Sequence, residues 1–212
     1  SILTGKGIRT GAEYIAGLQD DREIWTQGKR VKDVTSEPGM SRGVSSLAGF
    51  LDNQHNDKYR DKVTYVDEDG IRCPLSFKTP KSKQDILDRG KAYYEWATWS
   101  HGMFGRTPDY KNASLMSFAA ARSFLDQGTK GNAEFSKNML DFYNYARTND
   151  QILTHTLINP SVSHKQAAAG IYNDQVTLHV VKETDAGIIV TGARLLATLG
   201  PFADEIEVFP ST

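Results

Sequence analysis

Residues 132–158 read NAEFSKNMLDFYNYARTNDQILTHTLI, and the spacing of their apolar side chains changes part-way along. The first half carries apolar side chains at helical spacing, namely Phe135, Met139, Phe142 and Tyr143. They predict a helix that Asn132 caps and that ends near Arg147. After Asp150, residues 152–158 have the composition of a strand. The stretch therefore marks a change from helical to β sequence.

Upstream of this stretch, capping residues and apolar periodicity predict further helices. The predicted helices cover residues 11–20, 40–54, 82–100 and 108–125. Thr10 and Glu13 have the spacing of a capping box, in which each side chain accepts a hydrogen bond from the backbone of the other. Ser82 stands where the third helix needs an N-cap, and Thr107 with Pro108 supplies the N-cap and first residue of the fourth.

Strand patterns occur between the predicted helices and again after the last of them. The segments predicted to form strands and hairpins are residues 23–34, 63–77, 175–182 and 188–196. Helices followed by a separate run of strands favour an α+β fold over an alternating α/β sheet. We therefore expect a mainly helical N-terminal domain over residues 1–150 and the first part of a β domain over residues 151–212.

The composition of the 212 residues is typical of soluble globular proteins, with 39% hydrophobic and 24% charged residues. A net charge of −1 gives no basic surplus for binding nucleic acid or an anionic membrane surface. No apolar run reaches the roughly 18 residues that a membrane span needs. The single cysteine, Cys73, forms neither an internal disulfide nor a zinc site by itself, and it favours a reducing, cytoplasmic setting.

Both ends of the sequence lead us to expect a longer natural chain. The first residue is Ser1, and no initiator methionine or signal-peptide core accompanies it. The last residues follow strand-like sequence, and no closing element comes after Val208.

Arg106 and Tyr110 are the first candidates for chemistry, because they are four residues apart at the start of a predicted helix. A guanidinium and a phenol O–H on one helix face can hold a phenolate or carboxylate oxygen by charge-assisted hydrogen bonds. In the alternative, Arg106 pairs with Asp109 or a nearby carbonyl and Tyr110 packs in the core. Spacing alone favours this alternative, since such pairs are common.

His155 and Thr198 are the candidates in the β part. His155, inside a strand-like run, can accept a proton near neutral pH or orient a phenolic oxygen. Thr198 can donate a hydrogen bond to a ligand. The alternative for both residues is a side chain satisfied by backbone groups, and the residue types alone favour it for His155. The remaining histidines have no metal-like spacing and are interpreted as structural or surface residues, so we expect no metal site: His55, His101, His164 and His179.

Four blocks of sequence, in order, resemble one enzyme family. They are residues 10–35 (including Thr10-Gly11-Ala12-Glu13-Tyr14-Ile15), Gly105-Arg106-Thr107-Pro108-Asp109-Tyr110, Thr154-His155 with Asn159-Pro160, and residues 183–198. Together they resemble the 4-hydroxyphenylacetate 3-monooxygenase (oxygenase component) family over its N-terminal portion. Each block is weak by itself, but four in register are specific.

The resemblance implies an acyl-CoA dehydrogenase-like fold. This fold has a helical N-terminal domain, a β-barrel-like middle domain and a C-terminal helical bundle. The present chain would contain the first domain and the start of the second, with the C-terminal bundle missing. In the family that bundle builds the oligomer and part of the flavin site, so the resemblance implies a homo-oligomer, either a dimer or a tetramer.

The resemblance also implies a reaction. A separate flavin reductase supplies FAD as FADH2, O2 adds to give a C4a-hydroperoxyflavin, and a phenolic substrate is hydroxylated ortho to its hydroxyl. Positions matching Arg106, Tyr110 and His155 contact the phenolic oxygen, where a cation and hydrogen-bond donors stabilise developing negative charge. Positions matching flavin contacts are His155, Thr156, Leu157, Ser161, His164 and Thr198, although residues 161–164 depart from the residues usual in the family.

Two other functions stay open at this point. A 4-hydroxybutyryl-CoA dehydratase-like lyase belongs to the same superfamily, but it needs an iron–sulfur cluster held by several cysteines. Arg106 and Tyr110 stand where two of those cysteines are expected, and Cys73 is the one thiol in the sequence. A truncated copy that acts as a non-catalytic interaction module is the other alternative. Neither the residues nor the resemblance names the phenol.

Overall fold

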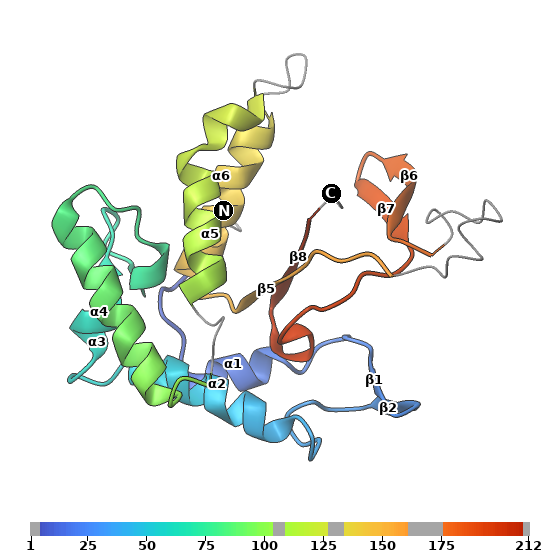
Figure 1. Ribbon diagram of the computed structural model, residues 1–212, viewed down its shortest axis with the longest axis horizontal. Helices are drawn as coiled ribbons and strands as arrows, with labels where there is room; N and C mark the ends of the chain where they lie inside the picture. The colour runs from blue at the N-terminus through green and yellow to red at the C-terminus, as the bar shows by residue number, and fades with distance from the viewer. Residues whose placement is uncertain (1–4, 104–108, 127–133, 161–175, 210–212) are drawn as a thin grey trace. The chain divides into compact units, whose positions relative to one another are not determined.

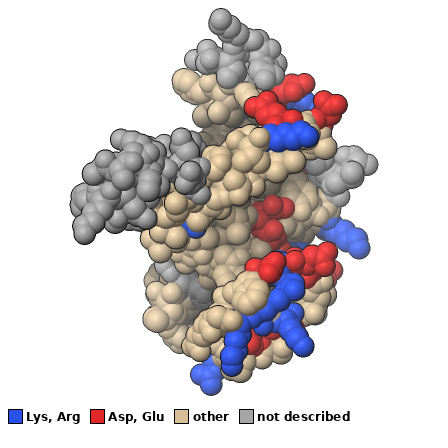
Figure 2. Space-filling view, turned by 90° about the vertical axis from the view of Figure 1, so that its right-hand side faces the viewer, with Lys and Arg blue, Asp and Glu red and all other residues tan. Residues whose placement is uncertain are grey.

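The computed structural model describes residues 5–103, 109–126, 134–160 and 176–209. The chain separates into two compact units, Ser1–Leu153 and Thr154–Thr212. No helix in the described ranges has the length and apolar character to cross a membrane. On the face drawn in Figure 2, acidic and basic side chains lie beside one another, in keeping with the near-zero net charge.

The first unit is mainly helical, as predicted (Figure 1). Its helices are α1 (Gly11–Gly17), α2 (Ser41–Asn53), α3 (Arg60–Val63), α4 (Lys83–Trp99), α5 (Asp109–Ala120) and α6 (Glu134–Thr148), with 3-10 turns at Leu75–Phe77 and Arg122–Asp126. The predicted capping box is confirmed, because Thr10 accepts from the Glu13 amide while Glu13 accepts from the Thr10 amide. Ser82 caps α4 as predicted. The caps predicted at Thr107 and Asn132 lie outside the described residues.

Two predicted hairpins flank α2 and α3. Strands β1 (Ile24–Thr26) and β2 (Lys29–Val31) pair antiparallel, as do β3 (Thr64–Val66) and β4 (Arg72–Pro74). Gln27 and Gly28 both have positive φ, the conformation that tight two-residue hairpin turns require.

Two clusters of buried side chains belong to the core of the first unit. One cluster joins α5, α6 and the turn Leu75–Phe77, and its buried members are Phe77, Leu115, Met116, Ala119, Tyr143, Ala146 and Leu153. The other joins α2, α3 and α4 through Phe50, Val63, Leu75, Ala92 and Trp96. A hydrogen bond of 2.6 Å from the Tyr143 hydroxyl to the Phe77 carbonyl fixes α6 to that turn.

The backbone conformation of Asp150 explains why helix α6 ends at Thr148. Its φ of 49° is left-handed, and the Gln151 amide donates back to the Ala146 carbonyl at 3.0 Å, which is the usual closing bond of a helix with such a cap. The buried Asp150 carboxylate accepts from the Arg9 amide at 3.1 Å and from the Gln54 amide group at 2.7 Å. These bonds offset the cost of the left-handed conformation, and the chain leaves α6 directly into the first strand of the β part.

The second unit contains strands β5 (Leu153–Thr156), β6 (His179–Thr184), β7 (Gly187–Thr191) and β8 (Glu205–Val208), with a 3-10 turn at Gly200–Phe202. Strand β5 pairs with β8, and β6 pairs antiparallel with β7. The strand predicted over residues 188–196 is too long, because regular pairing ends at Thr191. Gly192 has a φ of 108°, and a side chain there would meet the Thr177 carbonyl oxygen at 2.2 Å. Residues beyond it follow an irregular path.

Candidate functional site

Strand β5 carries three consecutive polar residues that the structure buries: Thr154, His155 and Thr156, between 4% and 5% exposed. Side chains alternate between the two faces of a strand, so Thr154 and Thr156 share one face and His155 lies on the other. Thr156 Oγ1 donates to the Leu195 carbonyl at 2.7 Å, and Thr154 Oγ1 donates to the Thr198 carbonyl. The two threonines therefore fasten the 195–198 segment to β5.

The ring of His155 packs edge-on against Phe209, with 6.3 Å between ring centroids. Phe209 is held there because its amide donates to the Thr156 carbonyl at 3.2 Å. The histidine is thus fixed in orientation by the residue that follows β8. A fixed imidazole is what a role in orienting a substrate oxygen requires.

Arg194 connects two of the sequence blocks that resemble the family. Its guanidinium donates to the Leu157 carbonyl at 3.4 Å, to the Asn159 side-chain oxygen and to the Phe209 carbonyl. The ends of β5 and β8 are therefore tied together around His155. Residue type and spacing did not mark Arg194 as a candidate functional residue. Its only signal in the sequence was its position inside a block that resembles the family.

Tyr110 lies in the first turn of α5 and is 48% exposed, so the alternative in which it packs in the core is wrong. The Lys111 ammonium is 6.0 Å from the centroid of its ring. Two residues farther along the chain, Asn112 donates to Ser76 Oγ at 2.9 Å, and both side chains are buried. This bond joins the start of α5 to the turn Leu75–Phe77 and so fixes the helix that carries Tyr110.

The predicted site residues are divided between the two units. Tyr110 belongs to the first, and the second contains His155, Thr156, Leu157 and Thr198. Leu157 and Thr198 are exposed. Arg106, Ser161 and His164 lie outside the described residues. The structure thus brings together the β5 and 195–198 segments, which the sequence had placed 40 residues apart, as Thr154 and Thr156 show.

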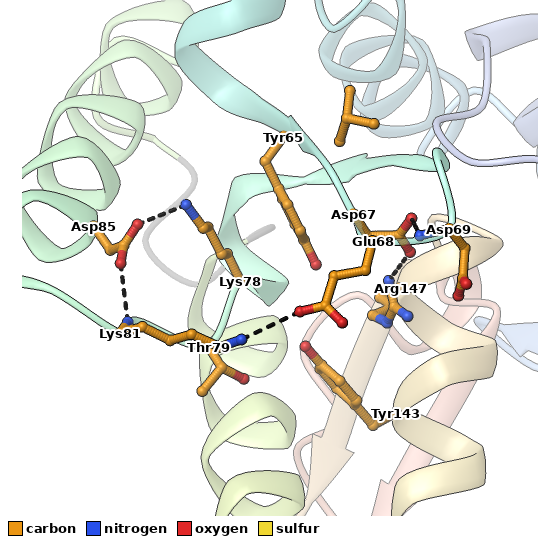
Figure 3. Close-up of a pocket in the computed structure, with 11 residues that line it drawn as sticks. Tyr65, Asp67, Glu68, Asp69, Lys78, Thr79, Lys81, Asp85, Tyr143 and Arg147 are labelled. Atoms are coloured by element: carbon orange, nitrogen blue, oxygen red, sulfur yellow. Dashed lines mark hydrogen bonds and ion pairs between the residues drawn. The ribbon is translucent and has the colours of Figure 1, made fainter.

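A cavity of about 520 Å³ in the first unit is lined by residues of β3, the chain after Phe77, and α6 (Figure 3). Three ion pairs run along it: Arg147–Asp67 at 2.5 Å, Lys78–Asp85 at 2.6 Å and Lys81–Glu68 at 3.3 Å. Each lining cation is therefore matched by a carboxylate, and Asp69 adds one further carboxylate, so the cavity has no positive surplus to attract an anionic ligand.

Titrating groups near this cavity are held in unreactive states. Burial raises the pKa of the Cys73 thiol to about 12 and also raises the pKa of the Tyr65 phenol. Burial alone would raise the pKa of the Asp67 carboxyl. The hydrogen bond and charge of Arg147, together with hydrogen bonds from the Ile71 and Asp69 amides, outweigh burial and hold that pKa below its usual value. A protonated thiol is a poor nucleophile. We interpret the network as structural.

Two of the remaining histidines contact backbone carbonyl groups. His55 Nε2 lies 3.0 Å from the Arg9 carbonyl, and His179 Nδ1 lies 2.8 Å from the Thr177 carbonyl. Among the residues that the structure describes, no three His, Cys, Asp or Glu side chains are grouped to hold a metal ion.

Comparison with known proteins identifies the family. The family profile described as 4-hydroxyphenylacetate 3-hydroxylase N terminal matches residues 10–212. The chain belongs to this family. A 4-hydroxyphenylacetate 3-monooxygenase oxygenase component from Thermus thermophilus is 41% identical over 205 residues, which cover 96% of this chain and 41% of the relative. The chain therefore spans about two fifths of that hydroxylase.

Solved structures agree with the family assignment. The crystal structure of a 4-hydroxyphenylacetate 3-monooxygenase oxygenase component complexed with FAD and 4-hydroxyphenylacetate matches with a TM-score of 0.84 and 41% identity, over 96% of this chain and 41% of that one. An archaeal 4-hydroxybutyryl-CoA dehydratase from N. maritimus matches with a TM-score of 0.77 at 17% identity, over 96% of this chain and 40% of that one. The second likeness shows a shared fold alone. The lyase alternative therefore has no support beyond the fold.

Proposed function

We propose that this chain is the N-terminal part of the oxygenase component of a two-component, flavin-dependent monooxygenase that hydroxylates a phenol ortho to its hydroxyl. The observation that carries the proposal is the match, at 41% identity and a TM-score of 0.84, to an oxygenase crystallised with FAD and 4-hydroxyphenylacetate. The whole protein would act in the cytoplasm as a homo-oligomer and receive reduced flavin from a separate reductase.

Arg106, Tyr110 and His155 are proposed to bind the phenolic oxygen. A phenol reacts at its ortho carbon more readily as the phenolate, so groups that stabilise negative charge on the oxygen favour the reaction. The guanidinium supplies a permanent cation, and the Tyr110 hydroxyl supplies a donor. The exposed position of Tyr110 and the fixed ring of His155 support these roles.

The residues of β5 and of the 195–198 segment fit a flavin in part. Reduced FAD, when bound, supplies the electrons that activate O2. The exposed Thr198 side chain can offer its hydroxyl to the cofactor, and exposed Leu157 offers apolar surface to its ring system. The Thr156 hydroxyl already donates to the Leu195 carbonyl, so we propose that this residue contributes through its backbone. Ser161 and His164 remain proposed contacts.

The second unit is proposed to be the beginning of a β-barrel-like middle domain. The hairpin β6–β7 supports this proposal because its apolar side chains are exposed: Val180, Val181, Ile188, Ile189 and Val190. A two-stranded hairpin with uncovered apolar faces is marginal by itself. Further strands and the proposed C-terminal bundle would belong to the rest of the protein.

Single substitutions in the full-length protein test the site. With reduced FAD, O2 and 4-hydroxyphenylacetate, Arg106→Ala and His155→Ala should each lower the rate of product formation by on the order of 100-fold, because each removes a group that stabilises the phenolate. Tyr110→Phe removes only the hydroxyl and should act in the same direction. The measurement is the rate at which hydroxylated product forms in single turnovers.

Two matched controls accompany these variants. His179→Ala removes a histidine whose ring faces the Thr177 carbonyl, and Tyr94→Phe removes the hydroxyl of an exposed tyrosine on α4. Both should turn over as the wild type does. Equal turnover of the site variants and their controls would remove Arg106, Tyr110 and His155 from the proposed site.

A further inference from the structure

The segment that contains Thr198 is held in a strained conformation. Leu196 and Leu199 have positive φ values of 64° and 65°. A side chain with a Cβ disfavours this left-handed region, and leucine gains no compensating local hydrogen bond there as asparagine does. Strain of this kind persists only where the surrounding structure imposes it, and it often accompanies function.

The hydroxyl groups of two β5 residues, Thr154 and Thr156, hold the segment in this strained conformation. Thr156 Oγ1 donates to the Leu195 carbonyl at 2.7 Å, and Thr154 Oγ1 donates to the Thr198 carbonyl. Each of these carbonyls belongs to the peptide unit directly before a left-handed leucine. A planar peptide unit rotates through ψ of the residue before it and φ of the residue after it. Each hydroxyl therefore holds the peptide unit whose rotation would relieve the positive φ.

The location of the two threonines makes these bonds effective. Thr154 and Thr156 lie on one face of β5, and both are 4% exposed. Water competes poorly for a hydroxyl group on a buried side chain, and a carbonyl that loses its donor loses the stabilisation of that bond. The Leu195 amide also donates to the Ile158 carbonyl at 2.8 Å, which anchors the start of the segment to the end of β5.

We infer that Thr154 and Thr156 are positioning residues that hold residues 195–199 in their strained form and thereby aim Thr198 at the flavin. Thr154 itself touches neither flavin nor phenol in this account. That the two threonines hold the strained form follows from the geometry alone. That they thereby aim Thr198 at the flavin rests on the proposed function.

The geometric half is tested by crystal structures of two full-length variants. Thr154→Val removes the hydroxyl but keeps the β-branched shape, and Thr154→Ser keeps the hydroxyl. In Thr154→Val we expect the peptide unit between Thr198 and Leu199 to rotate, so that φ of Leu199 becomes negative. In Thr154→Ser the positive φ should remain. An unchanged φ of Leu199 in Thr154→Val would overturn the inference, whatever reaction the protein catalyses.

The functional half is tested by coupling, the ratio of hydroxylated product to hydrogen peroxide, with reduced FAD and 4-hydroxyphenylacetate. Loss of this part-buried hydrogen bond predicts that Thr154→Val lowers the ratio by roughly fivefold to tenfold. Thr154→Ser should restore it. A merely destabilised protein would lose active molecules but keep the ratio, so an unchanged ratio in Thr154→Val contradicts the positioning role.

Thr64→Val is the matched control. Thr64 is also 4% exposed, begins strand β3 in the other unit, and donates through its hydroxyl to the Arg60 carbonyl at 2.6 Å. The Thr64 hydroxyl also accepts a hydrogen bond from the Arg72 guanidinium at 2.8 Å. The melting temperature of Thr64→Val should therefore fall at least as much as that of Thr154→Val, while its coupling stays at the wild-type value. Equal uncoupling in Thr64→Val would overturn the inference. A wild-type protein that hydroxylates no phenol would count against the proposed function and leave the crystallographic test decisive.

Discussion

The side chain of Leu196 disfavours the backbone conformation that the residue adopts. It is 72% exposed and left-handed, so its side chain gains little from packing while its Cβ disfavours the conformation. Glycine normally destabilises a position relative to alanine, but at positive φ the order reverses. We predict that Leu196→Gly is more stable than Leu196→Ala by about 1 kcal/mol.

Urea unfolding of the two Leu196 variants in the full-length protein measures this difference. An alanine variant as stable as the glycine variant, or more so, would mean that the left-handed conformation at Leu196 costs nothing. The same comparison at Val190, which lies in regular strand β7, provides the control, since there alanine should be the more stable.

Single residues differ in how far the sequence could reveal them. Tyr110 and His155 became candidates through the family resemblance, because spacing and residue type alone favoured the alternatives without a catalytic role. Thr154 and Arg194 could not be chosen in advance, because their importance comes from backbone carbonyls that a distant segment supplies. The same holds for Asp150, whose left-handed φ depends on Arg9 and Gln54.

Helix α6 and the hairpin β3–β4 are joined by the ion pair between Arg147 and Asp67, whose side chains are 14% and 8% exposed. Removing one partner of a buried pair leaves the other charge without compensation. We predict that Asp67→Asn lowers the free energy of unfolding at pH 7 by about 3 kcal/mol. Glu68→Gln is the control, because Glu68 and Lys81 form an exposed pair that should contribute little.

The direction of the Asp67 pKa shift fixes how this difference depends on pH. A carboxyl whose pKa is lowered in the folded protein stabilises the fold above its unfolded pKa, which is about 4. That stability is lost as pH falls through the lower, folded pKa. The gap in melting temperature between the wild type and Asp67→Asn should therefore be constant near neutral pH and shrink below about pH 4. A gap that widens on acidification would contradict this assignment.

Whole elements were predictable where a local signal defines them. The capping residues Thr10 and Ser82 marked the starts of α1 and α4, and the Gln27-Gly28 turn marked the first hairpin. Helix α3 was missed because four residues are too few to show a period. The strand predicted to Leu196 stops at Thr191, since the close approach of Gly192 to Thr177 is a tertiary effect.

On the scale of the whole molecule, the change from helical to β sequence after Asp150 and the family resemblance were both readable from the sequence. Membership of the 4-hydroxyphenylacetate 3-hydroxylase family confirms the resemblance over residues 10–212. The chain spans about two fifths of its Thermus relative, and we propose that the parts that enclose the active site and select the phenol belong to the rest of the protein. No pattern within 212 residues could have supplied them.

The most direct test of the proposed monooxygenase activity uses isotopically labelled oxygen. The full-length protein is mixed with reduced FAD and a panel of para-substituted phenols under 18O2, and the products are analysed by mass spectrometry. We predict a catechol from at least one phenol, with a single 18O atom at the position ortho to the original hydroxyl. Hydrogen peroxide as the sole product from every phenol, or a catechol that takes its new oxygen from water, would contradict a flavin-dependent monooxygenase.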